Sequence, residues 1–191
     1  MRNLLLISLI TLFVQSCAPL VGTVGMVSLG AASKEKGLGT SINDNLIKTK
    51  ISNLIYKHNE DLIADTKVFV NNGSVLYTGK LSNPNDKIEF TKLAWNIRGV
   101  KEVNNEIQIT DTSSLKNIAR DIASVGEIRA RIMADKSINS INFSIDVVND
   151  TAYISGVANS ELEMNLVKSH ASSARFIKEV YNYIILNKDT R

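Results

Sequence analysis

The chain has little of the chemistry that marks disulfide scaffolds, metal sites or nucleic-acid binders. Its 191 residues include one cysteine and two histidines, so it can form no intramolecular disulfide and offers few zinc ligands. It has only two prolines, and its formal net charge is +3. No long run of Lys and Arg occurs, and so weak a field does not indicate nucleic acid as a partner.

Signatures of catalysis are also missing. The sequence contains no G-x-S-x-G, H-E-x-x-H or P-loop pattern. Neither His58 nor His170 has a second His or Cys at ligand spacing, so we expect no metal and no other cofactor. We expect His58, at the end of a helix, to be solvated and His170, within a helix, to be a surface or partly packed residue. These absences predict a non-enzymatic protein and leave a hydrolase only as a remote alternative.

The N-terminal residues predict a secretory signal peptide. Arg2 provides a positive flank, and a mostly apolar run follows from Leu4 to Val14. That run is well short of the roughly 20 residues that a helix needs to span a bilayer. We therefore assign residues 1–16 to the signal peptide.

The single cysteine, Cys17, follows that run directly, in Val14-Gln15-Ser16-Cys17. This order resembles the bacterial lipobox, although Gln15 replaces the usual small residue. The alternative is a chance thiol beside an ordinary cleavage site. We expect Cys17 to take a diacylglycerol thioether and, on its new amine, a further acyl chain such as palmitate. More than one chain gives stable anchoring where a single chain is marginal.

Residues 17–40 predict a tether. The segment is rich in Gly, Ala, Ser and Val, and dense glycine disfavours both helix and strand. The alternative is an extension of the apolar run into a membrane segment, which Pro19 and the glycines oppose. A Gly-rich coil of about 20 residues has a root-mean-square reach of about 25 Å, enough to let a folded part turn one face toward the membrane.

An internal repeat organises the rest of the chain. Ile51 aligns with Ile128 and Gly79 with Gly156, a constant offset of 77 residues that needs no gap. The stretch Lys101-Glu102-Val103 recurs at the same offset in the second copy. Repetition at a fixed offset indicates copies of one structural unit. We therefore predict two small domains, at residues 41–110 and 117–188.

The hydrophobic period gives each copy the order α-β-β-α-β. In the first copy, Asn43 or Asp44 is the expected N-cap of the first helix, and Asn72-Gly73 is the hairpin turn. The predicted fold class is α+β, with two helices packed on a three-stranded mixed sheet in each domain. A unit of about 70 residues is small for one core, so we expect the copies to pack on each other or on a partner.

The repeated unit resembles the BON domain. The resemblance rests on the element order, on Asn72-Gly73, on Val75-x-Tyr77-x-Gly79, and on the stretch from Gly99 to Val103. In the second copy, Phe176 replaces the glycine of that last stretch and Asp150 replaces the hairpin glycine. The second copy is therefore the more diverged of the two.

Together, the signal peptide, the cysteine, the tether and the two domains resemble outer-membrane lipoproteins with two BON domains. The resemblance implies a non-enzymatic protein that is lipid-anchored in the outer membrane and faces the periplasm. It also implies that the protein binds anionic phospholipid and helps to maintain outer-membrane integrity. Ala18 is not the aspartate that retains enterobacterial lipoproteins in the inner membrane, which agrees with this location.

In that family the membrane contact is attributed to the first helix of the second domain. Ile128 and Ile132 align with Ile51 and Ile55, so we assign them to the core. The alternative is an ordinary amphipathic helix with a solvated charged face. The predicted phospholipid-binding residues are Arg120, Ile122, Val125, Arg129, Arg131 and Met133.

A different class of function is a protein-interaction module of a cell-envelope assembly complex. Its contact would be the sheet faces or Trp95, the only tryptophan, which we expect to be partly buried against the sheet. Ser172 takes the place of Trp95 in the second copy, so the fold itself does not demand an aromatic residue there. The sequence leaves the identity of such a partner and the oligomeric state open.

Overall fold

The computed structural model describes residues 38–110 and 115–187. The predicted signal peptide, Cys17 and nearly all of the predicted tether lie outside the described residues. Within these two ranges, no helix combines the length and the apolarity that crossing a bilayer requires.

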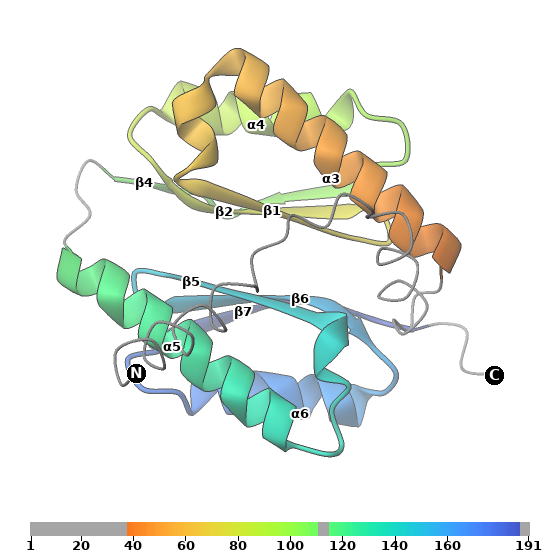
Figure 1. Ribbon diagram of the computed structural model, residues 1–191, viewed down its shortest axis with the longest axis vertical. Helices are drawn as coiled ribbons and strands as arrows, with labels where there is room; N and C mark the ends of the chain where they lie inside the picture. Colours follow the sequence, from red (N-terminus) through yellow and green to blue (C-terminus); the bar gives the residue numbers. More distant parts are fainter. Residues whose placement is uncertain (1–37, 111–114, 188–191) are drawn as a thin grey trace, which may run out of the picture. The chain divides into compact units, whose positions relative to one another are not determined.

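The first repeat is a mixed sheet with two helices on one face (Figure 1). Strand β1 is antiparallel to β2, and β3 and β4 both pair with β2 in parallel, so they share the place of one interrupted third strand. The elements are α3 (Leu38–His58), the 3₁₀ helix η1 (Glu60–Ile63), β1 (Thr66–Asn71), β2 (Ser74–Leu81), α4 (Pro84–Trp95), β3 (Glu102–Asn105) and β4 (Gln108–Ile109).

The second repeat has the same order and the same sheet, with a continuous third strand. Strand β5 is antiparallel to β6, and β7 is parallel to β6, which confirms the predicted α+β fold with mixed sheets. The elements are α5 (Leu115–Ala134), the 3₁₀ helix η2 (Ser140–Asn142), β5 (Phe143–Val148), β6 (Thr151–Ala158), α6 (Glu161–Ser172) and β7 (Glu179–Leu186).

Each repeat has a hydrophobic core of its own between its helices and its sheet. Ile51 and Ile55 are fully buried in the first core, and Ile128 and Ile132 occupy the equivalent places in the second. The assignment of these four residues to the core is therefore confirmed. Because both cores lie between residues 47 and 184, the chain from residue 38 onward contains every residue of both.

A buried aspartate joins the first helix of each repeat to the hairpin of the same repeat. Asp44 accepts hydrogen bonds from the backbone N–H groups of Asn72 (2.8 Å) and Gly73 (3.0 Å). The prediction that Asn43 or Asp44 caps the first helix was wrong, because α3 begins at Leu38 and Asp44 lies within it. Asp121 in α5 holds the second hairpin in the same way, through the backbone N–H groups of Asn149 and Asp150.

The sheet faces that turn away from the helices pack against each other. Leu76, Val148 and Tyr153 form a third buried apolar cluster between the two repeats. Beside it, the buried carboxylate of Asp146 accepts a hydrogen bond from Thr78 Oγ1 at 2.5 Å and a short one from Lys67 Nζ. The two copies thus bury surface against each other, and these sheet faces are not left open for another protein.

Replacing Tyr77 with phenylalanine is expected to raise the free energy of unfolding by about 1 kcal/mol. Tyr77 is fully buried against Phe90, and its hydroxyl has no hydrogen-bond partner among the described residues. Burial accordingly raises the pKa of the phenol. Ile154 fills the equivalent position, so the fold needs no hydroxyl there.

Urea denaturation of Tyr77→Phe measures this effect. Tyr56→Phe is the matched control, because Tyr56 is exposed and the change should stay within about 0.5 kcal/mol. A Tyr77→Phe variant less stable than the original chain would mean that the buried hydroxyl makes a stabilising hydrogen bond.

Candidate functional site

The solvent-facing side of α5 is apolar. Ile118, Ile122 and Met133 are spaced by four and eleven residues, which places them on one stripe of the helix. Their side chains are 39%, 67% and 73% exposed. The exposed residues that continue this face are all small: Ala119, Ala123, Gly126, Ala130 and Ala134.

Charge is sparse on this face. Among the exposed described residues of α5, only Lys116 and Arg129 are charged. Arg129 lies four residues before Met133 and seven after Ile122, so it belongs to the apolar stripe itself. We call Ile118, Ile122, Arg129 and Met133 the α5 stripe.

The first repeat shows that the fold does not require an apolar helix face here. At the offset of 77, Asn45 takes the place of Ile122 and Lys57 that of Ala134. The exposed side of α3 is accordingly mostly polar, with Lys48, Thr49 and Asn53 among its residues. Contiguous exposed apolar surface marks an interaction site more often than a structural need. The α5 stripe is therefore the candidate site.

Two of the predicted contact residues lie away from this stripe. Val125 is partly buried against the core of the second repeat, so only part of its side chain is open to solvent, and its contact with a membrane stays a prediction. Arg131 donates two hydrogen bonds to Glu127 Oε1, at 2.8 and 3.2 Å, and this interaction lowers the pKa of the Glu127 carboxyl. Ile122, Arg129 and Met133 remain as predicted residues on the exposed stripe.

A groove of about 690 Å³ borders the stripe. Ile118, Ile122 and Val125 line it from α5, and Leu62 and Leu81 line it from the first repeat. Charged residues, among them Asp65 and Lys80, also line the groove, so two residues of the stripe border a recess of mixed character as well as solvent.

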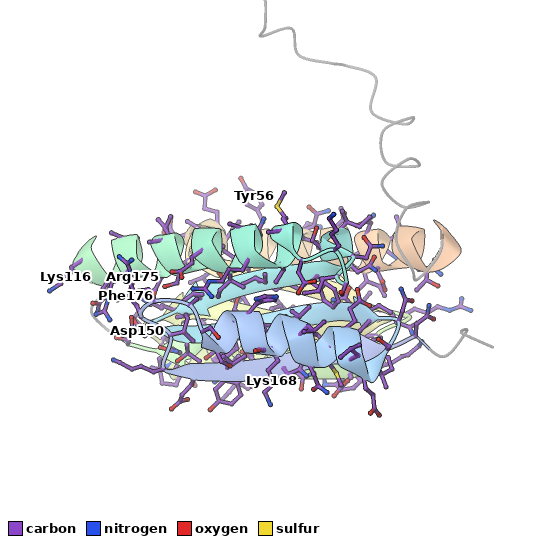
Figure 2. The ribbon with its side chains drawn as sticks, turned by 90° about the horizontal axis from the view of Figure 1, so that it is seen from below. Tyr56, Lys116, Asp150, Lys168, Arg175 and Phe176 are labelled. Carbon is purple, nitrogen blue, oxygen red and sulfur yellow. The ribbon has the colours of Figure 1, made fainter. Side chains whose placement is uncertain are left out.

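The last predicted residue, Arg120, belongs to a separate cluster at one end of the second repeat. Its Nη2 lies 3.0 Å from Asp150 Oδ2, and Lys178 Nζ lies 2.8 Å from the same oxygen. The Arg120 guanidinium carbon stands 4.8 Å above the Phe176 ring centre, and that of Arg175 lies 5.9 Å from it. Figure 2 shows Asp150, Arg175 and Phe176 at this end of the repeat, with Lys116 at the tip of α5. We call Arg120, Asp150, Arg175, Phe176 and Lys178 the cationic corner.

The sequence did not predict four members of the cationic corner as site residues: Asp150, Arg175, Phe176 and Lys178. The replacement of two glycines by Asp150 and Phe176 was the signal that could have found the corner. Asp150 has φ +64° and Phe176 has φ +72°, where the first repeat has Gly73 at +82° and Gly99 at +102°. Residues other than glycine rarely adopt this left-handed backbone conformation.

The other sequence candidates have ordinary surroundings. Trp95 is 54% exposed at the end of α4, so the expectation that it is partly buried against the sheet was wrong. His58 Nε2 lies 3.2 Å from Asp86, and His170 Nε2 lies 2.8 Å from Asp135, where it lowers the pKa of the Asp135 carboxyl. Over the two described ranges, no three His, Cys, Asp or Glu residues gather as a metal site would require.

Both repeats match a known protein family. The BON domain family matches residues 43–111 and 114–188. An uncharacterized protein in the gshII 5′ region of Anaplasma centrale is 34% identical over 146 residues, which are 76% of this chain and 95% of that protein.

Two relatives have descriptive names. The outer membrane lipoprotein DolP of Haemophilus influenzae is 26% identical over 172 residues, covering 89% of this chain and 88% of that protein. The osmotically-inducible protein Y of Escherichia coli is 24% identical over 147 residues, covering 76% of this chain and 73% of that protein.

Proposed function

The chain belongs to the BON-domain family, and from that premise we propose that it is an envelope protein that binds anionic phospholipid through the α5 stripe. In this proposal the chain is a non-enzymatic lipoprotein, anchored in the outer membrane by Cys17, that helps to maintain outer-membrane integrity. The observation that carries the lipid contact is the exposed apolar face of α5. On the equivalent helix α3, Leu46 and Tyr56 are exposed, and the other exposed described residues are polar.

The location is supported by the printed description of a relative. The Haemophilus influenzae protein that aligns over 89% of this chain is an outer membrane lipoprotein. Cys17 and the apolar run before it would supply the same kind of anchor here. The tether then allows the folded repeats to turn α5 toward the bilayer.

The energetics favour shallow insertion of α5 parallel to the membrane surface. Moving the exposed parts of Ile122 and Met133 into the acyl boundary would contribute roughly 1–2 kcal/mol each. Arg129 would contribute about 1 kcal/mol more near an anionic surface. The small residues between them let the helix backbone approach the lipid closely, and no charged side chain on the stripe other than Arg129 has to be desolvated.

Ile122→Asn is expected to weaken binding to anionic vesicles about tenfold, because it removes roughly 1–2 kcal/mol of apolar burial. Asparagine is the residue that the first repeat carries at this position, Asn45, so the fold tolerates it. The measurement is cosedimentation of the chain from residue 38 onward with vesicles of phosphatidylglycerol and phosphatidylcholine. Leu46→Asn is the matched control, because Leu46 is an exposed apolar residue of α3.

The charged residues give the same assay a second arm. Arg129→Glu should reduce binding more than Arg131→Glu, because Arg131 is held by Glu127 on the flank of the helix. Neither change should alter binding to pure phosphatidylcholine. Binding that is equal for the original chain, Ile122→Asn and Arg129→Glu would exclude the α5 stripe as the lipid contact.

Exposed Trp95 favours one other function, a protein-interaction module of an envelope assembly complex. Tryptophan is among the residues most enriched at the centres of protein interfaces. A protein adaptor should fail to sediment with anionic vesicles when it lacks its acyl anchor. It should also lose a protein partner upon Trp95→Ala, whereas a lipid binder should keep its affinity for vesicles in that variant.

A further inference from the structure

The loop that carries Phe176 is held in place from α5. Ser124 Oγ donates a hydrogen bond to the carbonyl oxygen of Arg175 at 2.9 Å. Glu127 Oε2 accepts one from the Arg175 backbone N–H at 3.0 Å. These two contacts fix the backbone immediately before Phe176 and so define where its ring stands.

The backbone of Phe176 has a conformation that favours glycine. Phe176 has φ +72° and is 40% exposed, so it gains less from burial than a core phenylalanine does. A side chain in this conformation is strained, and such strain concentrates at functional sites. In the first repeat, Gly99 makes the same turn at φ +102°. The fold is therefore compatible with glycine, and the second repeat carries an exposed aromatic ring instead.

The charges around the ring are mostly positive. Asp150 is the only carboxylate of the cationic corner, and both Arg120 and Lys178 bind the same oxygen of it. Arg175 lies outside this pairing, with its guanidinium beside the Phe176 ring. Two further carboxylates lie close by: Glu127 at the Arg175 backbone N–H and Asp121 at the Asp150 backbone N–H. Glu127 also pairs with Arg131, and Asp121 lies 3.8 Å from Lys80 Nζ, so the three cations of the corner exceed the charge of Asp150. Lys116 lies at the same end of the repeat (Figure 2).

We propose that the cationic corner binds the phosphate of an anionic phospholipid headgroup, with the Phe176 ring seated at the boundary between headgroups and acyl chains. Guanidinium groups bind phosphate through paired hydrogen bonds. Aromatic rings favour the membrane–water interface, where one side of the ring is apolar and the other is wet. The inference rests on the proposed function and deepens it, because it assigns the headgroup to residues outside the α5 stripe.

The first repeat lacks this chemistry although it keeps part of the sequence. Arg98 and Lys101 are the equivalents of Arg175 and Lys178. Asn43 takes the place of Arg120, and Gly99 that of Phe176. The second repeat therefore combines a mostly apolar helix face with the cationic corner. The first repeat has a mostly polar helix face and lacks the equivalents of Arg120 and Phe176.

The test compares variants of the full chain carrying Cys17→Ser, which cannot be acylated at that position. The readout is the ratio of affinities for vesicles with phosphatidylglycerol and vesicles of phosphatidylcholine alone. Any binding by the predicted signal peptide is common to all variants and depends little on lipid charge. The ratio of the two affinities therefore reports the headgroup contact.

The combined change Arg175→Gln and Phe176→Gly should lower this ratio about tenfold, because it removes one cation and the ring. Arg98→Gln in the first repeat is the matched control and should leave the ratio unchanged. A ratio that stays the same in the combined variant overturns the inference. If Ile122→Asn still weakens binding in that case, the proposed function stands without it.

Stability is measured on the same samples. Phe176→Gly should leave the melting temperature unchanged or raise it, because glycine suits the left-handed turn. If the glycine variant melts earlier, Arg175→Gln alone provides the test, because it leaves the turn intact.

Soluble glycerol 3-phosphate gives the last arm, followed through the amide signals of Arg175 and Phe176. We expect it to bind far more weakly than vesicles do, because it offers the ring no interface. Binding of the soluble compound as tight as binding to vesicles would identify a small-anion site and overturn the assignment to lipid. A chain that shows no preference for anionic vesicles would overturn both this inference and the proposed function.

Discussion

Gly79→Ala is expected to destabilise the chain by roughly 3 kcal/mol or more, through backbone strain and overpacking together. Gly79 lies in β2 with φ +125°, a backbone conformation that residues other than glycine rarely adopt. A Cβ atom there would stand 2.2 Å from the carbonyl oxygen of Asp65 and 2.8 Å from the Cα of Thr66. Because both atoms belong to the backbone of the neighbouring segment, no side-chain rotation can relieve the clash.

Two other glycines test the reasoning. Gly156, the equivalent of Gly79, would bring a Cβ within 2.3 Å of the carbonyl oxygen of Asn142, so Gly156→Ala should be similarly harmful. Gly126 lies in α5 with no atom within 4 Å of an added Cβ, so Gly126→Ala should stabilise the helix by up to about 1 kcal/mol. Urea denaturation followed by circular dichroism measures all three. A Gly79→Ala chain that unfolds at the original midpoint would refute the clash.

Asp121→Ala is expected to cost about 3 kcal/mol or more, since a hydrogen bond to a charged group contributes about 1.5–3 kcal/mol. Asp121 accepts hydrogen bonds from the backbone N–H groups of Asn149 at 2.9 Å and Asp150 at 3.0 Å. Alanine would leave both donors without this acceptor inside the protein. The change would also remove the carboxylate that stands 3.8 Å from Lys80 Nζ.

The equivalent change in the first repeat, Asp44→Ala, should have an effect of similar size, because Asp44 accepts the same pair of hairpin amides. Asp61→Ala is the control, since Asp61 is exposed and the change should stay within about 0.5 kcal/mol. Hydrogen exchange locates the effect: the Asn149 and Asp150 amides should lose protection first in Asp121→Ala. Unchanged protection at both amides would mean that the hairpin does not depend on this carboxylate.

The element order and the two cores could be predicted because they depend on local periodicity and on repetition. The spacing of Ile51 and Ile55 predicts a buried helix face, and the repeat at Ile128 and Ile132 gives that pattern a second, independent copy. Gly79 and Gly156 recur at the same offset because an added Cβ atom would clash with backbone atoms at both positions.

The roles of Asp44 and Phe176 could not be predicted from local patterns. An aspartate near a helix start favours an N-cap, but the partners of Asp44 lie 28 and 29 residues away and meet it only in the folded repeat. Trp95 follows a buried alanine in a helix, which suggests burial, yet the turn at the end of α4 leaves it exposed. For the candidate site, sequence supplied Ile122, Arg129 and Met133, and it missed the three cationic-corner residues that the α6–β7 loop contributes.

The contact between the two sheets also decides which domain each repeat will accept as a partner. Asp146 of the second repeat takes the position that Phe69 has in the first, and Tyr153 takes that of Leu76. Two first repeats would lack the carboxylate that Thr78 and Lys67 require, and two second repeats would bring two such carboxylates into one interface. Specific pairing of this kind disfavours wrong partners through unpaired polar groups. Joined in one chain, the two repeats also meet at an effective concentration of the order of millimolar, so neighbouring copies crowded on a membrane should not exchange domains.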